Sequence, residues 1–575
     1  MGDNISRTIT PNPPADFTPS MRNYQTLQPF RYWCQKVLPL VYDDSLSYYE
    51  LLCKVIDYLN KTMQDVETLH GDVTNLHVAY EKLQAYVNNY FSTLDVQEEI
   101  NKKLDEMVTS GELYQYIQKY LGLFTTPIVY GAVGDGVTDD TDAFINMLTD
   151  GAKYIDLVGK KYLLTKNLTL DIKHIKNGEI LTNNTTSILN DAFLTFTGSN
   201  INIENISVNC GHYVDRPFYK QTGYDEYISL RNSTLVGIKL FNCTNVYVSN
   251  VLCTECVNAL FITDSSFIRV NSCTAYKTLG DGFYVTGNSH DVVISNCIAN
   301  SVMDDNFSVN GFSQNSSELP SRIVYTNCTS YNCFGALVAL LSCNECSASN
   351  LTGYGNKYSP IKLGALEVNK NYACESRNTS ISNITCYLNS QVDLVDNALL
   401  LIDGTASKTS KHININNLTI NFYGNPVKAV FRYVDRLDIS SLILNGVNVS
   451  FENSSNVSLS NSSMFVNSIT LTGLNYATFA NSNITTTSYG INVGSCNNVS
   501  ILNIEHLTHI YVNGCRNIKT DVRVDGQNSS GVITTPTDVS KIYDMMANGT
   551  FILNEDGRIG YVYNNKAVWV NTIPS

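Results

Sequence analysis

Residues 279–309 read LGDGFYVTGNSHDVVISNCIANSVMDDNFSV, and the two ends of this stretch resemble each other. The segment GDGFYV aligns with DDNFSV when Phe283 is placed on Phe307, 24 residues later. The alignment puts Asp281 over Asp305, with Asp304 beside them. A chain with only 16% charged residues therefore repeats a carboxylate at one phase of an internal repeat.

The segment VISNC in this stretch is one copy of a pattern that runs through the middle of the chain. The pattern is an apolar residue, any residue, Asn or Ser, and then usually an apolar residue or Cys. Most steps between copies are near 22 residues, and three carry about ten more. The third position falls at Asn205, Asn250, Ser272, Asn296, Asn327, Asn350, Asn383, Asn417, Ser441, Asn461, Asn481 and Asn503.

This period, made of short strands and Asn-rich turns, predicts a solenoid. Leucine-rich repeats have a similar length, but they need a dense leucine framework and alternating helices, which this sequence lacks. We therefore expect a mainly β protein built on a right-handed parallel β-helix. In such a fold, residues of equal phase stack at the strand spacing of about 4.8 Å. Val251, Cys273, Cys297 and Cys328 should form one such ladder inside.

The segments on either side of the repeats have a different character. Residues 30–60 have helical apolar spacing. Residues 66–94 continue with apolar positions three and four apart, which predicts a parallel coiled coil of two or three copies; the alternative is a helix packed on its own domain. The expected organisation is a flexible arm at 1–25, a helical adaptor at 26–65, a coiled coil and helical neck at 66–125, the β-helix at 126–530, and a C-terminal cap or trimerisation element at 531–575.

Composition excludes several classes of function. A net charge of −14 argues against a protein that coats nucleic acid, because phosphate neutralisation needs clustered Lys and Arg. We find no apolar run of signal-peptide or membrane-spanning length. The 16 cysteines are then expected to be reduced and buried. Two CxxC pairs, at 253–256 and 343–346, lie too many coils apart to share a zinc ion, so we predict no metal and no cofactor.

Two sets of residues carry a resemblance to known families. IVYGAVGDGVTDDTDAFINML, from Ile128 to Leu148, resembles the opening of the pectate-lyase superfamily β-helix proteins. FRYWCQKVLPLVYDDSLSYYELLCKVIDYLN and LDVQEEINKKLDEMVTSGEL resemble modules of tail-spike, appendage and fibre proteins of phages with Gram-positive hosts. The resemblance implies a homotrimeric virion protein of the tail, made in the host cytoplasm without a signal peptide. Its N-terminal helical region would dock on other virion proteins, and its β-helix would face a bacterial cell-surface glycan.

The repeated aspartates also resemble those of polygalacturonase-type β-helix glycosidases, which implies that Asp281, Asp304 and Asp305 are catalytic. The chemistry is reasonable on its own terms. Glycoside hydrolysis needs one carboxylic acid and one carboxylate. Like charges on adjacent coils raise the pKa of one of them, which keeps a proton donor available. Two alternatives stay open: aspartates that accept hydrogen bonds from turn amides, and a non-catalytic contact with a sugar or an ion.

Weaker candidates for glycan binding surround this pair of coils. Glu255 lies one coil before Asp281, and Lys277 could neutralise an acidic sugar. Tyr224 and Tyr227 belong to an aromatic-rich loop whose rings could stack on sugars, or could instead fold onto the solenoid or a neighbouring subunit.

The sequence thus predicts a phage tail spike or appendage that binds a bacterial surface polysaccharide or wall teichoic acid. We expect it to degrade this glycan, by hydrolysis rather than lyase elimination, because carboxylates repeat and no Lys or Arg base repeats beside them. The alternative is a non-catalytic receptor-binding protein on the same scaffold. A cellular polysaccharide enzyme and a purely architectural virion protein are less consistent with these features.

Overall fold

The computed structural model describes most of the repeat region and parts of the segments on either side of it. It describes residues 124–520 apart from 189, 219–220, 314, 366–373, 389–397, 405–407, 423–426, 487–489 and 508, together with parts of 34–110 and the strands between 523 and 569. The chain divides into two compact units, Met1–Leu113 and Tyr114–Ser575. The second unit contains the candidate site.

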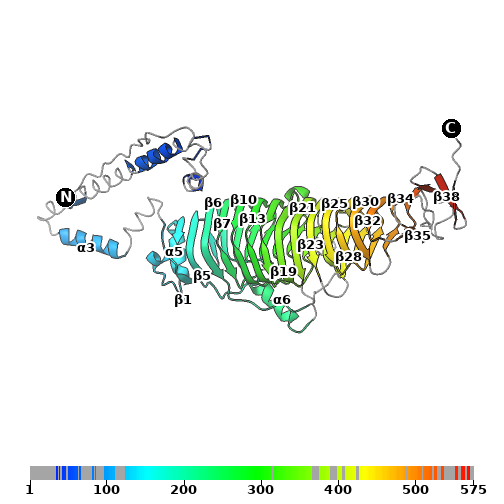
Figure 1. Cartoon of the computed structure of the whole chain (residues 1–575). Coiled ribbons are helices and arrows are strands. Elements are labelled where there is room, and N and C mark those ends of the chain that lie inside the picture. Colours follow the sequence, from blue (N-terminus) through cyan, green and yellow to red (C-terminus); the bar gives the residue numbers. More distant parts are fainter. Residues whose placement is uncertain are drawn as a thin grey trace. The chain divides into compact units, whose positions relative to one another are not determined.

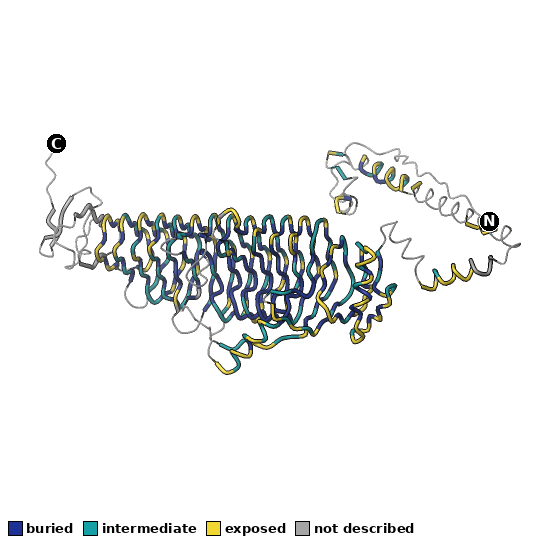
Figure 2. Tube along the Cα trace, turned by 180° about the vertical axis from the view of Figure 1, so that it is seen from behind, coloured by how far each residue is buried: buried dark blue, intermediate teal, exposed yellow. Residues whose placement is uncertain are grey.

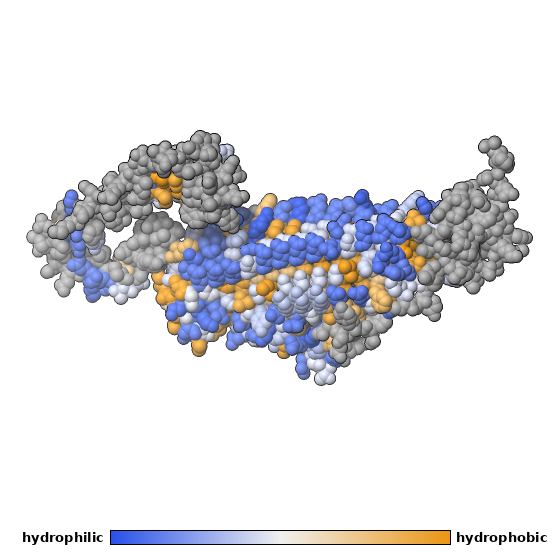
Figure 3. Space-filling view, viewed as in Figure 1, coloured by the Kyte–Doolittle hydropathy of each residue, from blue (hydrophilic) through white to orange (hydrophobic). Residues whose placement is uncertain are grey.

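The second unit is a parallel β-helix, as the sequence predicts (Figure 1). Its strands pair in parallel with the strands one coil before and one coil after, and they form three parallel sheets that we name for their outward residues. The site sheet carries the aspartates; the polar sheet carries mainly Ser and Asn; the threonine sheet carries a row of threonines such as Thr329, Thr352 and Thr385. Figure 3 shows hydrophilic rows that run along the solenoid.

The strands that belong to the site sheet alone are β4 (Leu168–Leu170), β9 (Leu260–Thr263), β12 (Phe283–Thr286), β15 (Phe307–Asn310), β18 (Val338–Leu341), β20 (Ile361–Gly364), β22 (Ala398–Asp403), β24 (Val427–Arg432), β26 (Val447–Glu452), β29 (Ser468–Thr472), β31 (Ile491–Gly494), β33 (His509–Asn513) and β35 (Arg523–Gln527). Those of the polar sheet are β2 (Tyr154–Asp156), β10 (Ser266–Asn271), β13 (His290–Ser295), β16 (Ser321–Thr326), β27 (Ser455–Ser460), β34 (Arg516–Thr520) and β36 (Val532–Thr535).

Those of the threonine sheet are β1 (Asp135–Asp139), β3 (Lys161–Leu163), β8 (Leu252–Thr254), β11 (Thr274–Thr278), β14 (Ile298–Val302), β17 (Thr329–Tyr331) and β28 (Ser463–Val466). Longer strands turn a corner and serve two sheets: β5 (His174–Leu181), β6 (Ala192–Asn209), β7 (Val236–Ser249), β19 (Ser347–Asn356), β21 (Arg377–Leu388), β23 (Ser410–Asn421), β25 (Val434–Asn445), β30 (Asn475–Thr486) and β32 (Asn497–Glu505).

The repeated Asn or Ser marks one corner of the coil. All twelve positions of the pattern have a left-handed backbone with φ between 49° and 56°, a conformation that Asn tolerates better than other residues with a side chain. The asparagines also bond to one another between coils. Asn383 donates from its amide to Asn350 Oδ1 at 3.1 Å and accepts from the Asn417 amide at 2.9 Å. The repeated Asn or Ser in the sequence pattern therefore marks the left-handed residue at this corner of each coil.

The interior consists of stacked apolar residues, as the buried strands in Figure 2 show. Val251, Cys273, Cys297 and Cys328 are each at most 4% exposed, which confirms the expected ladder. Phe283 and Phe307 stack with ring centroids 5.5 Å apart and planes 9° from parallel. All 16 cysteines are unbridged and all except Cys53 are buried, so neither CxxC pair forms a disulfide.

A short helix closes the N-terminal end of the solenoid. Residues 131, 134 and 136 are glycines with positive φ, and they carry the chain into helix α5 (Thr141–Thr149). Asp139 accepts a hydrogen bond from the Thr141 amide at the start of this helix. Asp140 instead accepts from the amides of Val133 and Gly134, which ties down the glycine-rich turn. Phe144 and Met147 are buried against the first coil.

The remaining helices are α3 (Val96–Thr109), α6 (Tyr224–Ser233), and the short 3-10 helices η3 (Pro127–Tyr130) and η4 (Ser316–Glu318). Residues 50–62 are also helical, and Leu51 and Val55 pack with Cys34 in a small core. Most of the predicted coiled coil, the arm at 1–25 and much of the expected C-terminal element at 531–575 lie outside the described residues. At the C-terminal end β36 pairs in parallel with β37 (Phe551–Asn554), which begins an antiparallel run with β38 (Ile559–Tyr563) and β39 (Lys566–Trp569).

Within the described part of the chain, no helix combines the length and the apolar character that crossing a membrane requires.

The corner asparagines provide a test of the fold. Asn383→Gly removes the inter-coil amide bonds but keeps a residue that accepts φ of 53°, whereas Asn383→Ala loses both. We expect the free energy of unfolding of the alanine variant to fall about 1–2 kcal/mol below that of the glycine variant. Equal unfolding energies for the two variants would mean that this corner is not left-handed in solution.

Candidate functional site

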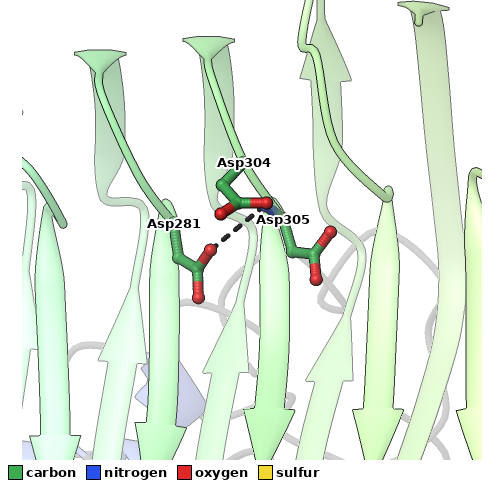
Figure 4. Close-up of side chains that lie close together, drawn as sticks. All are labelled: Asp281, Asp304 and Asp305. Atoms are coloured by element: carbon green, nitrogen blue, oxygen red, sulfur yellow. Dashed lines mark hydrogen bonds between the residues drawn. The ribbon is translucent and has the colours of Figure 1, made fainter. Parts of the chain in front are cut away.

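Register places the three aspartates together. Asp281 precedes strand β12, Asp304 and Asp305 precede strand β15, and the two strands pair with Phe283 opposite Phe307. Figure 4 shows Asp281 and Asp305 on neighbouring coils, with Asp304 between them. One carboxylate oxygen of each aspartate lies within 4.8 Å of the other two. The sequence alignment that suggested this cluster therefore corresponds to a contact in space.

Two of the aspartates also link successive coils. Asn258 Oδ1 accepts a hydrogen bond from the Asp281 amide at 2.7 Å. Asp281 Oδ1 accepts in the same way from the Asp305 amide at 3.1 Å, and Asp305 Oδ1 from the Ala336 amide at 2.9 Å. Asn258 accepts the same inter-coil hydrogen bond one coil before Asp281. The bond therefore needs a side-chain oxygen but not a charge.

Three cationic side chains compensate the cluster. Arg231 donates from NH2 to Asp304 Oδ2 at 2.7 Å, and Arg216 NH1 lies 3.7 Å from Asp304 Oδ1. Lys362 Nζ lies 2.9 Å from Asp305 Oδ1. The Lys362–Asp305 ion pair is largely screened from water, since the side chains of Asp305 and Lys362 are 9% and 17% exposed. Among the residues that the structure describes, no cation forms an ion pair with Asp281, and Ser308 Oγ donates to its Oδ2 at 2.9 Å.

These surroundings shift the pKa values of Asp281 and Asp304 in opposite directions. Burial raises the pKa of Asp281 well above its usual value, and the nearby charges of Asp304 and Asp305 raise it further. Burial also opposes ionisation of Asp304, but Arg231, Arg216 and Lys362 outweigh it and hold the pKa of that carboxyl below its usual value. The site thus combines a carboxyl whose pKa is raised, Asp281, with one whose pKa is lowered, Asp304.

A small cavity of about 150 Å³ opens beside Asp304. Its wall contains the two arginines, Lys362, and three tyrosines: Tyr224, Tyr227 and Tyr358. Asp281 does not line this cavity, but its carboxylate is within 4.8 Å of Asp304, which does. The arrangement places a carboxyl with a raised pKa next to the carboxylate that lines the cavity.

The two arginines reach the aspartates from an insertion between strands β6 and β7. Helix α6 in this insertion carries Arg231, and Tyr227 on the same helix donates from its hydroxyl to the Leu279 carbonyl at 2.5 Å. Arg216 donates to the Met303 carbonyl at 3.1 Å and lies over the ring of Phe334, 4.3 Å from its centroid. The insertion is therefore fastened to the coils that carry the acids.

The coil after Asp305 leaves space for this packing. A Cβ atom added to Gly335 would lie 2.2 Å from the Asp304 carbonyl carbon, so only glycine permits the close approach of these two coils. The Gly335 amide donates to the Asp304 carbonyl at 3.2 Å. This glycine holds the Asp304 backbone in place beneath the cavity.

The weaker sequence candidates lie at different distances from the cluster. Tyr224 and Tyr227 line the cavity, although Tyr227 is only 1% exposed and its ring, like those of Tyr213 and Phe218, packs on the solenoid. Lys277 lies over the rings of Tyr213 and Tyr276 at about 5.5 Å. Glu255 occupies a left-handed turn with φ of 54° and is not one of the converging carboxylates.

Sequence reasoning missed Arg216, Arg231, Lys362 and Tyr358. The arginines lie 50 or more residues before the acids in an insertion without a repeat, so no periodic signal marks them. Lys362 is different, because it occupies the same outward row as Ser308, two coils later. A search for cations in that row would have found it.

Among the described residues, the three aspartates are the group whose oxygens converge closely enough to hold a metal ion. A cation at that position would compete with Lys362 and Arg231, which already contact Asp305 and Asp304. A hard divalent cation prefers several free oxygen ligands, so this charge-compensated cluster is a poor match.

Comparison with known proteins identifies phage relatives. No protein-family model matches the chain. A pre-neck appendage protein of Bacillus phage B103 is 23% identical over 380 residues, which cover 61% of this chain and 42% of that protein. The pre-neck appendage protein of Bacillus phage phi29 is 24% identical over 282 residues, 47% of this chain and 30% of that protein. The expected similarity to phage appendage proteins is confirmed, although the chain spans less than half the length of these relatives.

Solved structures resemble the chain only loosely. The crystal structure of the pre-mature phi29 gene product 12 is 12% identical, with a TM-score of 0.39 over 81% of this chain and 78% of that one. A likeness this weak has no bearing on function.

The raised pKa of Asp281 predicts a pH-dependent stability difference. Between about pH 4, where an unfolded aspartate ionises, and the higher pKa in the folded protein, the folded state binds more protons than the unfolded state. Stability therefore falls as pH rises through this window. In Asp281→Asn the amide oxygen still accepts the Asp305 amide bond, and the Ser308 hydroxyl can turn to accept from the new amide.

We thus expect thermal midpoints of Asp281→Asn and wild type to agree near pH 3 and to diverge in favour of the variant as pH rises above about 4. The difference between the two thermal midpoints should stop growing once the pH exceeds the pKa of Asp281 in the folded protein. A midpoint difference that stays constant with pH would show that the Asp281 carboxyl has an ordinary pKa.

Proposed function

We propose that the chain is a phage appendage protein that binds a bacterial surface glycan and hydrolyses it at the Asp281–Asp304–Asp305 cluster. The observation that carries this proposal is the contact between a carboxyl with a raised pKa, Asp281, and a carboxyl with a lowered pKa, Asp304, which lines a cavity. Glycosidases divide acid and base roles between two carboxyl groups in this way.

The roles follow from the surroundings. The raised pKa of Asp281 favours its protonated form, so in this proposal Asp281 acts as the acid that protonates the leaving glycosidic oxygen. Asp304 lines the cavity and is held ionised by Arg231, so it acts as the nucleophile or as the base that activates water. Asp305 supplies negative charge beside Asp281, while Lys362 keeps Asp305 paired.

The placement of the chain in a virion rests on its relatives, which are named pre-neck appendage proteins. In this proposal the β-helix faces the host and takes a surface polysaccharide or wall teichoic acid. The N-terminal helical region docks on another virion protein, and the heptad pattern over 66–94 joins three copies in parallel. Trimeric assembly would place three sites on one appendage and raise avidity for a polymeric glycan.

A glycan-binding protein without catalysis is the second candidate, and one observation favours it. Asn258, Asp281 and Asp305 form a continuous series of inter-coil hydrogen bonds, which gives the acids a structural role that needs no chemistry. This candidate predicts adsorption to the glycan with no shortening of its chains.

Activity of Asp281→Asn separates the two candidates. The substitution preserves the inter-coil bond, as Asn258 does naturally, and removes only the acid. We expect the full-length variant to remain folded, to bind wall teichoic acid or capsular polysaccharide from the host, and to release reducing ends at least about 100-fold more slowly than wild type. Equal release by variant and wild type would exclude Asp281 as the acid.

Asp305 needs a paired substitution, because Asp305→Asn alone would leave the Lys362 ammonium buried without its partner. The double variant Asp305→Asn/Lys362→Met removes both charges. In this variant the pKa of Asp281 should be lower than in wild type, because one neighbouring negative charge is gone. The alkaline limb of the pH–rate profile should therefore move to lower pH.

Arg231 offers a test of the charge arrangement. Arg231→Gln removes the guanidinium that lowers the pKa of Asp304 and that also opposes the rise in the pKa of Asp281. Both pKa values should rise, so the whole bell-shaped profile of kcat/KM should move to higher pH. A lower rate with an unmoved profile would assign Arg231 a merely structural role.

A further inference from the structure

We infer that the groove continues past the catalytic cluster into a second glycan subsite, built around Asp403 and Arg432, that binds neutral sugar units of the same chain. The inference rests on the proposed function, and it adds that the substrate is an oligomer lying along the solenoid axis toward the C-terminus.

The second subsite is a cavity of about 510 Å³, larger than the cavity beside Asp304. Its floor comes from consecutive strands of the site sheet: Leu341 on β18, Leu363 on β20, Leu401 on β22 and Val430 on β24. Four adjacent strands span three strand spacings, or roughly 14 Å. A ligand that fills this length is longer than one sugar ring.

The two cavities form one continuous surface, because Tyr358 and Lys362 line both of them. Lys362 Nζ lies 4.5 Å from the centroid of the Tyr358 ring and 2.9 Å from Asp305 Oδ1. Lys362, which lines both cavities, thus also contacts the catalytic cluster. A glycan bound at Asp403 would pass Tyr358 on its way to Asp304.

The lining suits a sugar without charge. Arg432 donates from Nε and NH2 to the two oxygens of Asp403, each at 2.7 Å, so the pair is fixed and its charges cancel. The Arg432 side chain is 41% exposed and lines the cavity. A fixed donor and acceptor set can orient sugar hydroxyls, while Leu401 and Val430 present apolar surface to the ring faces.

The cavity beside Asp304 has a different set of charged residues in its lining. Two arginines and one lysine share it with Asp304, whereas the second cavity has the Asp403–Arg432 pair and Lys362, which is already paired with Asp305. The second subsite therefore contributes length recognition and orientation and takes no part in bond cleavage.

A filling substitution tests this without disturbing an ion pair. Leu401→Trp projects an indole into the second cavity and leaves Asp403, Arg432 and the catalytic cluster unchanged. The matched control is Thr470→Trp. Thr470 lies in the same outward row, two coils beyond Val430, and does not line the cavity.

The probes are host wall teichoic acid or capsular polysaccharide and size-separated fragments of it, used with the full-length chain. For long fragments we expect Leu401→Trp to raise KM about tenfold or more, with kcat within about twofold of wild type, and for the shortest cleaved fragment we expect little change. Thr470→Trp should behave as wild type throughout. The same Leu401→Trp change in the Asp281→Asn background should weaken binding of long fragments to a similar extent.

Equal KM values for Leu401→Trp and Thr470→Trp on long fragments would overturn the inference while leaving the proposed catalysis intact. If wild type releases no product and Leu401→Trp binds long fragments more weakly than wild type does, the result would support the subsite and exclude the catalytic role. A wild type that neither binds nor cleaves the glycans would overturn both proposals together.

Discussion

In-register parallel hydrogen bonding between coils is the constraint on which the site depends. Phe283 pairs with Phe307, and Phe307 with Val338, so residues 24 and then 31 positions apart become direct neighbours. The longer second step is absorbed outside the strands, by the segment that contains helix η4. Insertions can therefore vary while the stacked face keeps its register, which is how three acids from two coils come to share one location.

Such stacking has an electrostatic cost that the rest of the molecule offsets. Buried like charges are unfavourable, and here Asp304 and Asp305 each have a cation within 3 Å, while the pKa of Asp281 is raised so that its neutral form is favoured. The cations come from Arg231 in a distant insertion and from Lys362 two coils along. A cluster that served only to link coils could use asparagine, as the neighbouring coil does at Asn258; the acids at 281 and 305 are the feature that our proposal of glycan hydrolysis explains.

Much of the fold could be predicted from the sequence, because a solenoid turns a one-dimensional period into a three-dimensional neighbour relation. The corner asparagines, the cysteine ladder and the contact between Asp281 and Asp305 all follow from that period. Arg216, Arg231 and helix α6 could not be predicted, since an insertion without a repeat has no register, and its contacts with Met303 and Leu279 depend on tertiary packing alone.

The most direct test of the account is a crystal structure of the Asp281→Asn variant with host glycan bound. The account predicts that the glycan lies along the site sheet, with a glycosidic oxygen within hydrogen-bond distance of residue 281 and a sugar ring against Tyr358. A glycan bound on the polar or threonine sheet, with the aspartates untouched, would contradict it.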